Sequence, residues 1–123
     1  MTLRPRVLVL GCGWIARQVH LPYLVGLQRD RRVEAVYAAD AEEGKATAIA
    51  QEFGVRPYRL GALAGPSRPD GGVEPGALEG FDVVVVAAFP GSHARLIQAA
   101  LAAGAHVIGE KPLRAHRRFL GSG

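Results

Sequence analysis

Val7-Leu8-Val9-Leu10 runs directly into Gly11-Cys12-Gly13-Trp14-Ile15-Ala16 near the start of the chain. The uninterrupted apolar run indicates a strand that is buried on both faces. In the G-x-G-x-x-A loop that follows, Gly11 permits a tight turn, Gly13 has no Cβ to hinder an approaching phosphate, and Ala16 allows close helix–strand packing. Because free N–H groups at a helix start face such an anion, the stretch predicts a strand–turn–helix unit that binds a dinucleotide pyrophosphate.

Composition and charge exclude several classes of protein. The chain has 123 residues, of which 49% are hydrophobic and 21% are charged, as is typical of one globular domain. The longest apolar run, 83–89, is too short to span a bilayer, so we expect no membrane partner. The net charge of +4 comes from arginines spread along the chain without a nucleic-acid-binding motif, so we expect no nucleic-acid partner. Cys12 is the only cysteine, which predicts a cytoplasmic protein without an intrachain disulfide; we also predict no metal site.

Strand and helix patterns alternate along the chain. This order predicts an α/β fold with a doubly wound parallel sheet (Rossmann) of about five strands, and a ligand at the carboxyl ends of the strands. The segment 61–80 contains six glycines and three prolines, and we interpret it as an irregular surface loop rather than a functional lid. The expected strands are 6–10, 33–39, 56–60, 81–88 and 105–109.

The expected helices have distinct boundary signals. The first should begin at Trp14, carry Ile15 and Val19 on one face, and break near Leu21, because Pro22 cannot continue it; a second short helix should reach about residue 27. The next should have acidic residues at 42 and 43, an inward stripe at 46, 49, 50 and 53, and a glycine stop at 54. For the last, a serine at 92 is the candidate cap and a glycine at 104 the stop.

Asp40 ends the second expected strand, at the place where a carboxylate can accept hydrogen bonds from the adenosine ribose hydroxyls. The same carboxylate would repel a 2′-phosphate, so we expect NAD as the cofactor, with NADP less favoured; Lys45 is the nearest cation in the sequence. The alternative role for Asp40 is a helix N-cap, and the two roles are compatible.

Two further segments follow buried strands. Phe89-Pro90-Gly91-Ser92-His93 should flank the nicotinamide half of the cofactor, where His93 could contact ribose or phosphate or could occupy a first helical turn. Within Glu110-Lys111-Pro112, the lysine could hydrogen-bond a substrate hydroxyl or carbonyl and help to move its proton; the alternative is a solvated strand end. Trp14 could cover the pyrophosphate or pack against a neighbouring loop.

Taken together, these segments resemble the Gfo/Idh/MocA oxidoreductase family over residues 5 to 113. The resemblance rests on 7–16, His20-Leu21-Pro22, Asp40, Pro90 with His93, and 103–112. It implies the N-terminal nucleotide-binding domain of an oxidoreductase that transfers hydride between nicotinamide and a sugar- or polyol-like substrate. It also implies a set of cofactor-binding residues and one catalytic residue, Lys111; the cofactor-binding residues would be Gly11, Gly13, Trp14, Ile15, Asp40, Phe89, Pro90, His93 and Glu110.

Members of that family continue past Glu-Lys-Pro with another strand and a large substrate-contacting domain. Here ten arginine-rich residues follow Leu113, so we expect one domain over 1–113, a poorly ordered basic tail at 114–123, and no C-terminal catalytic domain. We therefore expect weak NAD binding, little hydride transfer by the chain alone, and a sugar or polyol substrate only if a second domain is supplied. Self-association through the strand edge 105–109 is also expected; the alternative function is a non-catalytic NAD-binding module or truncated gene product.

Overall fold

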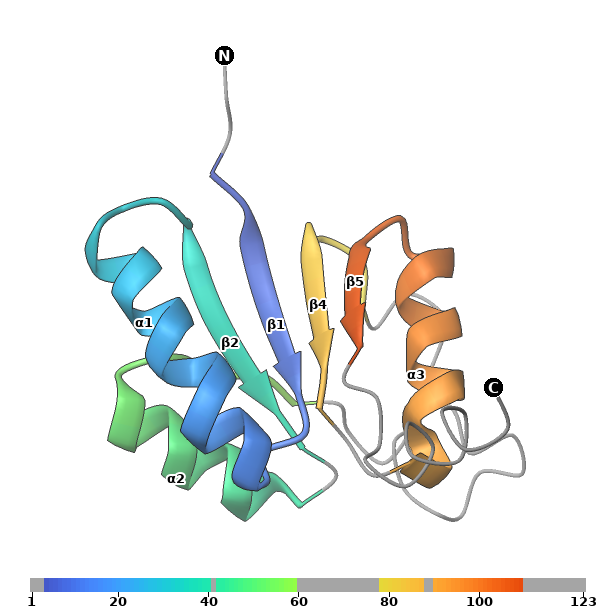
Figure 1. The fold of residues 1–123 in the computed structure, drawn as a ribbon, viewed down its shortest axis with the longest axis horizontal. Helices are drawn as coiled ribbons and strands as arrows, with labels where there is room; N and C mark the ends of the chain where they lie inside the picture. The colour runs from blue at the N-terminus through green and yellow to red at the C-terminus, as the bar shows by residue number, and fades with distance from the viewer. Residues whose placement is uncertain (1–3, 41, 60–77, 88–89, 110–123) are drawn as a thin grey trace, which may run out of the picture.

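The chain is organised around a five-stranded parallel sheet with the order β3-β2-β1-β4-β5 (Figure 1). The computed structural model describes residues 4–40, 42–59, 78–87 and 90–109. Its strands are β1 (Arg6–Leu10), β2 (Ala35–Ala39), β3 (Arg56–Pro57), β4 (Val83–Val86) and β5 (His106–Gly109). Its helices are the π-helix η1 (Ala16–His20), α1 (Leu21–Arg29), α2 (Glu43–Phe53) and α3 (Pro90–Ala102).

The strand order places helices on both faces of the sheet. The chain moves outward from β1 to β2 and β3, then returns to the other side of β1 for β4 and β5. Because parallel crossovers are right-handed, this reversal puts α1 and α2 on one face and α3 on the other, as Figure 1 shows. The predicted doubly wound α/β fold is therefore confirmed.

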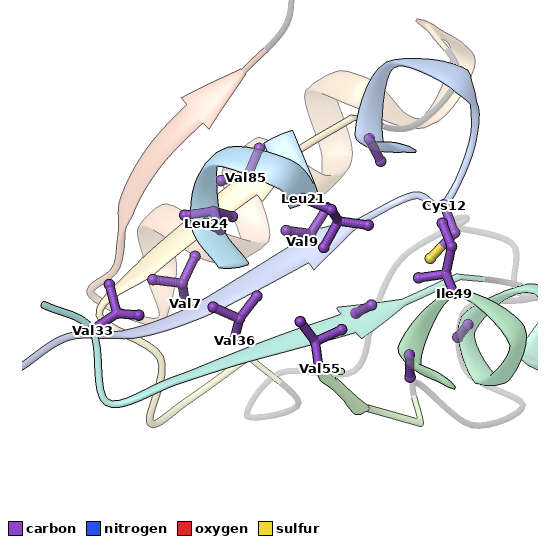
Figure 2. Packing of buried hydrophobic residues seen from close by; sticks show 14 residues of the cluster. Val7, Val9, Cys12, Leu21, Leu24, Val33, Val36, Ile49, Val55 and Val85 are labelled. Carbon is purple, nitrogen blue, oxygen red and sulfur yellow. The ribbon is translucent and has the colours of Figure 1, made fainter. Parts of the chain in front are cut away.

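Side chains of β1 alternate between two separate cores. Val7 and Val9 join the core under α1 and α2, which Figure 2 shows with Leu24 and Ile49, whereas Leu8 joins the core on the α3 face. Leu8 and Val9 are both 0% exposed. The apolar run 7–10 is thus buried on both faces, as its sequence predicts.

The helix after the glycine loop does not break at Leu21. Helical backbone begins at Trp14, and both His20 and Leu21 keep right-handed helical torsion angles. The Leu21 N–H donates to the Ala16 carbonyl oxygen, five residues back, which closes a π turn. The missing N–H of Pro22 is thereby placed in the first turn of α1, where proline is tolerated, so the expected break is replaced by a wider turn.

The π turn also changes which side chains face the core. One extra residue in the turn shifts the helix phase, so Ala16, Leu21 and Leu24 are buried. Val19 is 47% exposed and Ile15 is partly buried, so the face on which the sequence places these two residues is not the face that enters the core.

The boundary signals of the other two helices have different outcomes. In α2 the inward stripe is confirmed, and Gly54 ends the helix with a φ of 72° in the left-handed region. In α3 the helix begins at Pro90, so Ser92 lies inside the helix rather than at its cap; proline is favoured at a first helical position because its φ is already helical. The segment 60–77 lies outside the described residues.

Strand β5 forms one edge of the described sheet, at the opposite side from β3. Ile108 of this strand is 51% exposed, and it pairs in register with the buried Val85 of β4. Self-association through this edge stays a prediction. Within the described ranges, none of the helices is long and apolar enough to cross a membrane.

The π turn can be tested by comparing two apolar residues on either side of it. We expect Leu21→Ala to lower the free energy of unfolding by about 2–5 kcal/mol, because Leu21 is completely buried. Val19→Ala should cost less than about 1 kcal/mol, because Val19 is half exposed. Urea denaturation followed by circular dichroism measures both, and an equal cost for the two variants would contradict the helix phase described here.

Candidate cofactor-binding site

The carboxyl ends of the central strands meet at one edge of the sheet. The loop after β1 is held to β2 by a hydrogen bond from the Gly11 N–H to the Ala39 carbonyl oxygen at 2.8 Å. On the other side, the Ala87 N–H donates to the Leu10 carbonyl oxygen, also at 2.8 Å. The loops that leave β1, β2 and β4 therefore start side by side, at the position where doubly wound sheets bind ligands.

The glycine loop has the two properties that a phosphate cradle requires. Gly11 has a φ of 102°, a conformation that side chains with a Cβ rarely adopt. At Gly13, an added Cβ would meet no heavy atom of the described protein within 4 Å, so the backbone there faces open space. The loop backbone is thus accessible to a ligand.

The helix start behind this loop supplies hydrogen-bond donors. The Arg17 N–H donates to the Gly13 carbonyl oxygen at 3.1 Å. The N–H groups of Trp14 and Ile15 precede this bond and have no acceptor within the helix, as at every helix N-terminus. With the positive end of the helix dipole, these groups suit a bound anion.

Asp40 links this loop to the start of α2. Its Oδ2 accepts a hydrogen bond from the Cys12 N–H at 2.8 Å, and its Oδ1 accepts one from the Glu42 N–H at 2.9 Å. The N-cap of α2 is Glu42 rather than Asp40. Asp40 lies two residues before this cap and accepts its backbone N–H. A carboxylate has about four acceptor positions, so it can still receive ribose hydroxyls; that role stays a prediction.

The sequence did not reveal how Asp40 is held. The bond to Glu42 could have been anticipated, because an aspartate in a turn commonly accepts a hydrogen bond from the backbone N–H two positions later in the chain. The bond from Cys12 joins residues 28 positions apart and depends on the register in which β1 and β2 pair. A local sequence pattern does not predict that register.

Two ion pairs involve side chains of η1 and of the first residues and last turns of α2, the helices that follow β1 and β2. Arg17 of η1 and Glu52 of α2 form an ion pair at 2.8 Å, and Lys45 lies 3.8 Å from Glu42 at the start of α2. Both pairs are solvent-exposed, so each contributes little to stability. Lys45 is of interest because of its position: it places a positive charge in the first turn of α2, shortly after Asp40.

Cys12 is a buried thiol inside the loop. Its Sγ lies 3.6 Å from the Ala39 carbonyl oxygen, and the residue is 6% exposed. The pKa of the Cys12 thiol is raised from 9.0 to about 12, chiefly by burial and then by the charge of the Asp40 carboxylate, whereas Lys45 acts to lower it. Cys12 is therefore a small packed residue with a protonated thiol rather than a nucleophile.

The remaining predicted site residues are described to different extents. Trp14 is 71% exposed, so it does not pack tightly against a neighbouring described loop. His93 lies in the first turns of α3, as one of its two interpretations required. Phe89, Glu110 and Lys111 lie outside the described residues, as do the side chains of Pro90 and His93. In the part of the chain that is described, no group of three or more His, Cys, Asp or Glu residues could hold a metal ion.

The raised pKa of the Cys12 thiol predicts a loss of stability in alkali. Above pH 9 the unfolded chain loses the thiol proton, whereas the folded protein keeps it up to about pH 12. Through this residue the free energy of unfolding should fall with rising pH in that window, by at most about 1.4 kcal/mol per pH unit. Urea denaturation between pH 8 and 10.5 should show this slope as the difference between the wild type and Cys12→Ala; identical slopes would contradict it.

Comparison with known proteins identifies the wider relationship. The model of the oxidoreductase family with an NAD-binding Rossmann fold, Gfo/Idh/MocA, matches residues 5–118. The chain is similar to KijD10, a 3-ketoreductase from Actinomadura kijaniata whose structure was solved with NADP and TDP-benzene. The TM-score is 0.66 and the sequence identity is 31%, and the match covers 95% of this chain and 33% of KijD10. A putative myo-inositol dehydrogenase from Sinorhizobium meliloti gives a TM-score of 0.62 and 26% identity over 98% of this chain and 33% of that one.

A third structure supports the fold alone. This is a UDP-N-acetylglucosamine 3-dehydrogenase from Acidithiobacillus ferrooxidans, with a TM-score of 0.61 and 21% identity over 98% of this chain and 35% of that one. The chain thus spans about a third of the length of these structures. No curated protein sequence matches the chain significantly. Because KijD10 is solved with NADP, the expectation that NADP is less favoured than NAD is not supported.

The family model covers most of the chain and begins one residue before β1, and the fold it describes is the one observed. The chain therefore belongs to the Gfo/Idh/MocA family of oxidoreductases, and the part it contains is the NAD-binding Rossmann domain.

Proposed function

We propose that the chain binds NAD or NADP, with the pyrophosphate against Gly11, Gly13, Trp14 and Ile15 and the adenosine ribose beside Asp40. One observation carries this proposal: the backbone of Gly13 faces open space directly ahead of a helix start. The N–H groups of that helix start can donate to pyrophosphate oxygens. The positive φ of Gly11 supports the proposal further, because it turns the chain sharply out of β1.

Two charges of opposite sign would decide between the two dinucleotides. The carboxylate of Asp40 suits the ribose hydroxyls of NAD and would repel the 2′-phosphate of NADP. Lys45 lies in the first turn of α2 and would attract that phosphate. We therefore assign the choice of dinucleotide to the balance of these two side chains rather than to Asp40 alone.

For the nicotinamide half, the proposal rests on the family resemblance. Phe89, Pro90, His93 and Glu110 would line that half of the cofactor, and Lys111 would hydrogen-bond the reacting hydroxyl or carbonyl and help to move its proton. The nicotinamide would supply the hydride acceptor or donor when bound. These residues follow β4 and β5, whose carboxyl ends lie at the same edge of the sheet as the glycine loop.

For the substrate, we propose a chemical class rather than a single compound. The similar proteins include a ketoreductase and a putative inositol dehydrogenase, which supports a hydroxyl- or carbonyl-bearing sugar or polyol as substrate. These proteins are about three times as long as this chain, so we propose that the complete reaction also needs groups that a second domain supplies. A cytoplasmic location is supported by the single, unpaired Cys12.

The glycine cradle can be tested by adding one methyl group. Gly13→Ala should leave the fold intact, because the new Cβ meets no described protein atom. It should weaken dinucleotide binding by about tenfold or more, because the methyl would hold the pyrophosphate away from its N–H donors. Isothermal titration calorimetry with NAD and with NADP measures the affinity.

Gly26→Ala is the matched control for this variant. An added Cβ at Gly26 also meets nothing within 4 Å, but the residue lies in α1 away from the loop. This control should keep the wild-type affinity and gain up to about 1 kcal/mol in stability from the better helix former. Unchanged binding by Gly13→Ala, or an equal loss in Gly26→Ala, would overturn the proposed cradle.

The balance of Asp40 and Lys45 predicts opposite shifts in cofactor preference. Asp40→Asn should raise the ratio of NADP affinity to NAD affinity by about fivefold, since one charge contact of about 1 kcal/mol is removed. Lys45→Gln should lower the same ratio by a similar factor. The ratio cancels any general loosening of the loop, because both dinucleotides share the pyrophosphate. Shifts in the same direction for the two variants would contradict the assignment.

A further inference from the structure

Two arginines and a tyrosine form a cluster away from the glycine loop. Arg6 is the first residue of β1, Tyr37 is the central residue of β2, and Arg56 is the first residue of β3. Arg56 pairs in register with Tyr37, and Leu8 pairs with Tyr37 on the other side. The three side chains therefore lie on the α3 face of the sheet, and Arg6 stands at the opposite end of β1 from Gly11. We call them the Arg6–Tyr37–Arg56 cluster.

Both guanidinium groups of the cluster donate to one phenol oxygen. Arg6 Nη2 lies 3.2 Å from the Tyr37 hydroxyl oxygen, and Arg56 Nη1 lies 3.3 Å from the same atom. The Arg6 Cζ is 5.2 Å from the centres of both the Tyr37 and Phe81 rings, and the Arg56 Cζ is 5.8 Å from the Tyr37 ring. Two like charges are thus held against a single neutral group.

The donors of this cluster outnumber its acceptors. The Tyr37 oxygen accepts two hydrogen bonds, and no acceptor for its own O–H is found among the described residues. The guanidinium of Arg6 makes one more bond, from Nη1 to the Gly80 carbonyl oxygen at 2.8 Å, and that of Arg56 makes none beyond the phenol to any residue that the structure describes. A guanidinium has five N–H donors, so several donors of both arginines have no acceptor among the described parts of the chain.

Nearby carboxylates do not neutralise these donors directly. The pKa of Arg6 is raised chiefly by its hydrogen bond to Tyr37, and the negative charges of Glu34 and Asp82 add smaller increases. However, Asp82 Oδ2 accepts the backbone N–H of Arg6 at 2.7 Å, not its guanidinium. Within the described ranges, neither Arg6 nor Arg56 forms an ion pair with a carboxylate. The pKa of Tyr37 is lowered, chiefly by its hydrogen bond from Arg6 and then by that from Arg56, which is consistent with an electropositive site.

We propose that the Arg6–Tyr37–Arg56 cluster is a second anion-binding site that takes a phosphate group. A phosphate oxygen would accept the Tyr37 O–H, and its neighbouring oxygens would accept the remaining N–H groups of the two guanidinium forks. The site opens toward solvent at Arg56, which is exposed. It is separate from the dinucleotide site, because that site uses backbone N–H groups at the carboxyl ends of the strands. The proposal does not depend on the function proposed above.

Inorganic phosphate is the probe for this site, with sodium chloride at matched ionic strength as the reference. In ¹H–¹⁵N correlation spectra of the full chain, phosphate should shift the backbone amides of Tyr37, Gly80 and Asp82 in a saturable way. Shifts at Gly13 and Trp14 report the glycine loop separately, so binding at the two sites is distinguished in one titration.

Variants assign the binding to the cluster. Arg56→Gln should weaken the phosphate affinity at the cluster about tenfold, because one charged hydrogen-bonding group is lost. Tyr37→Phe should also weaken it, through loss of the O–H donor. Arg6 is left intact, because it also bonds the Gly80 carbonyl oxygen beside β4. Arg32→Gln is the matched control: it removes the same charge from an exposed arginine outside the cluster and should keep the wild-type affinity.

Three outcomes would overturn the proposal. The first is that chloride at equal ionic strength shifts the cluster amides as much as phosphate does. The second is that Arg56→Gln and Arg32→Gln weaken binding equally, which indicates a general charge effect. The third is that phosphate shifts only Gly13 and Trp14, which would show that phosphate binds at the glycine loop and not at the cluster.

Discussion

The pairing of β1 with β2 on one side and β4 on the other is the constraint on which the rest of the structure depends. The ladders are parallel and run through residues 7–10 of β1 on both sides. Because all strands point the same way, every loop that follows a strand starts at the same edge of the sheet. Burial of β1 on both faces fixes this register, since a shift by one residue would exchange the side chains of the two cores.

Asp40 converts that register into a defined loop geometry. Two backbone N–H groups, from the β1 loop and from the start of α2, donate to one carboxylate. Charge-assisted bonds of this kind are stronger than bonds between neutral groups. The residue that we propose as the ribose ligand therefore also holds the pyrophosphate loop against β2. In physical terms, ribose recognition and loop position are coupled through one side chain, and a change of charge there affects both.

Much of the fold could be predicted because its signals are local. The apolar run of β4, the inward stripe of α2 and the left-handed Gly54 each depend on neighbouring residues alone. The π turn could not be predicted in the same way. Pro22 indicates that ordinary helical bonding must change, but whether the helix breaks or widens depends on whether Leu21 and Leu24 can still reach the core. At the candidate site, the glycine loop was visible in the sequence, whereas the bond from Cys12 to Asp40 was not, because the pairing of two strands creates it.

The two anion sites that we infer differ in the origin of their positive potential. At the glycine loop, the donors are backbone N–H groups whose positions are fixed by the turn and by the helix that follows. At the Arg6–Tyr37–Arg56 cluster, they are side chains with full charges, and Arg56 is exposed to solvent. Salt screens exposed charges much more than partly buried ones. The loop is therefore suited to holding a ligand in a defined orientation, whereas the cluster is suited to weaker, salt-sensitive binding of a phosphate group. Both follow from the same register, because β2 contributes Asp40 just beyond its end and Tyr37 at its centre.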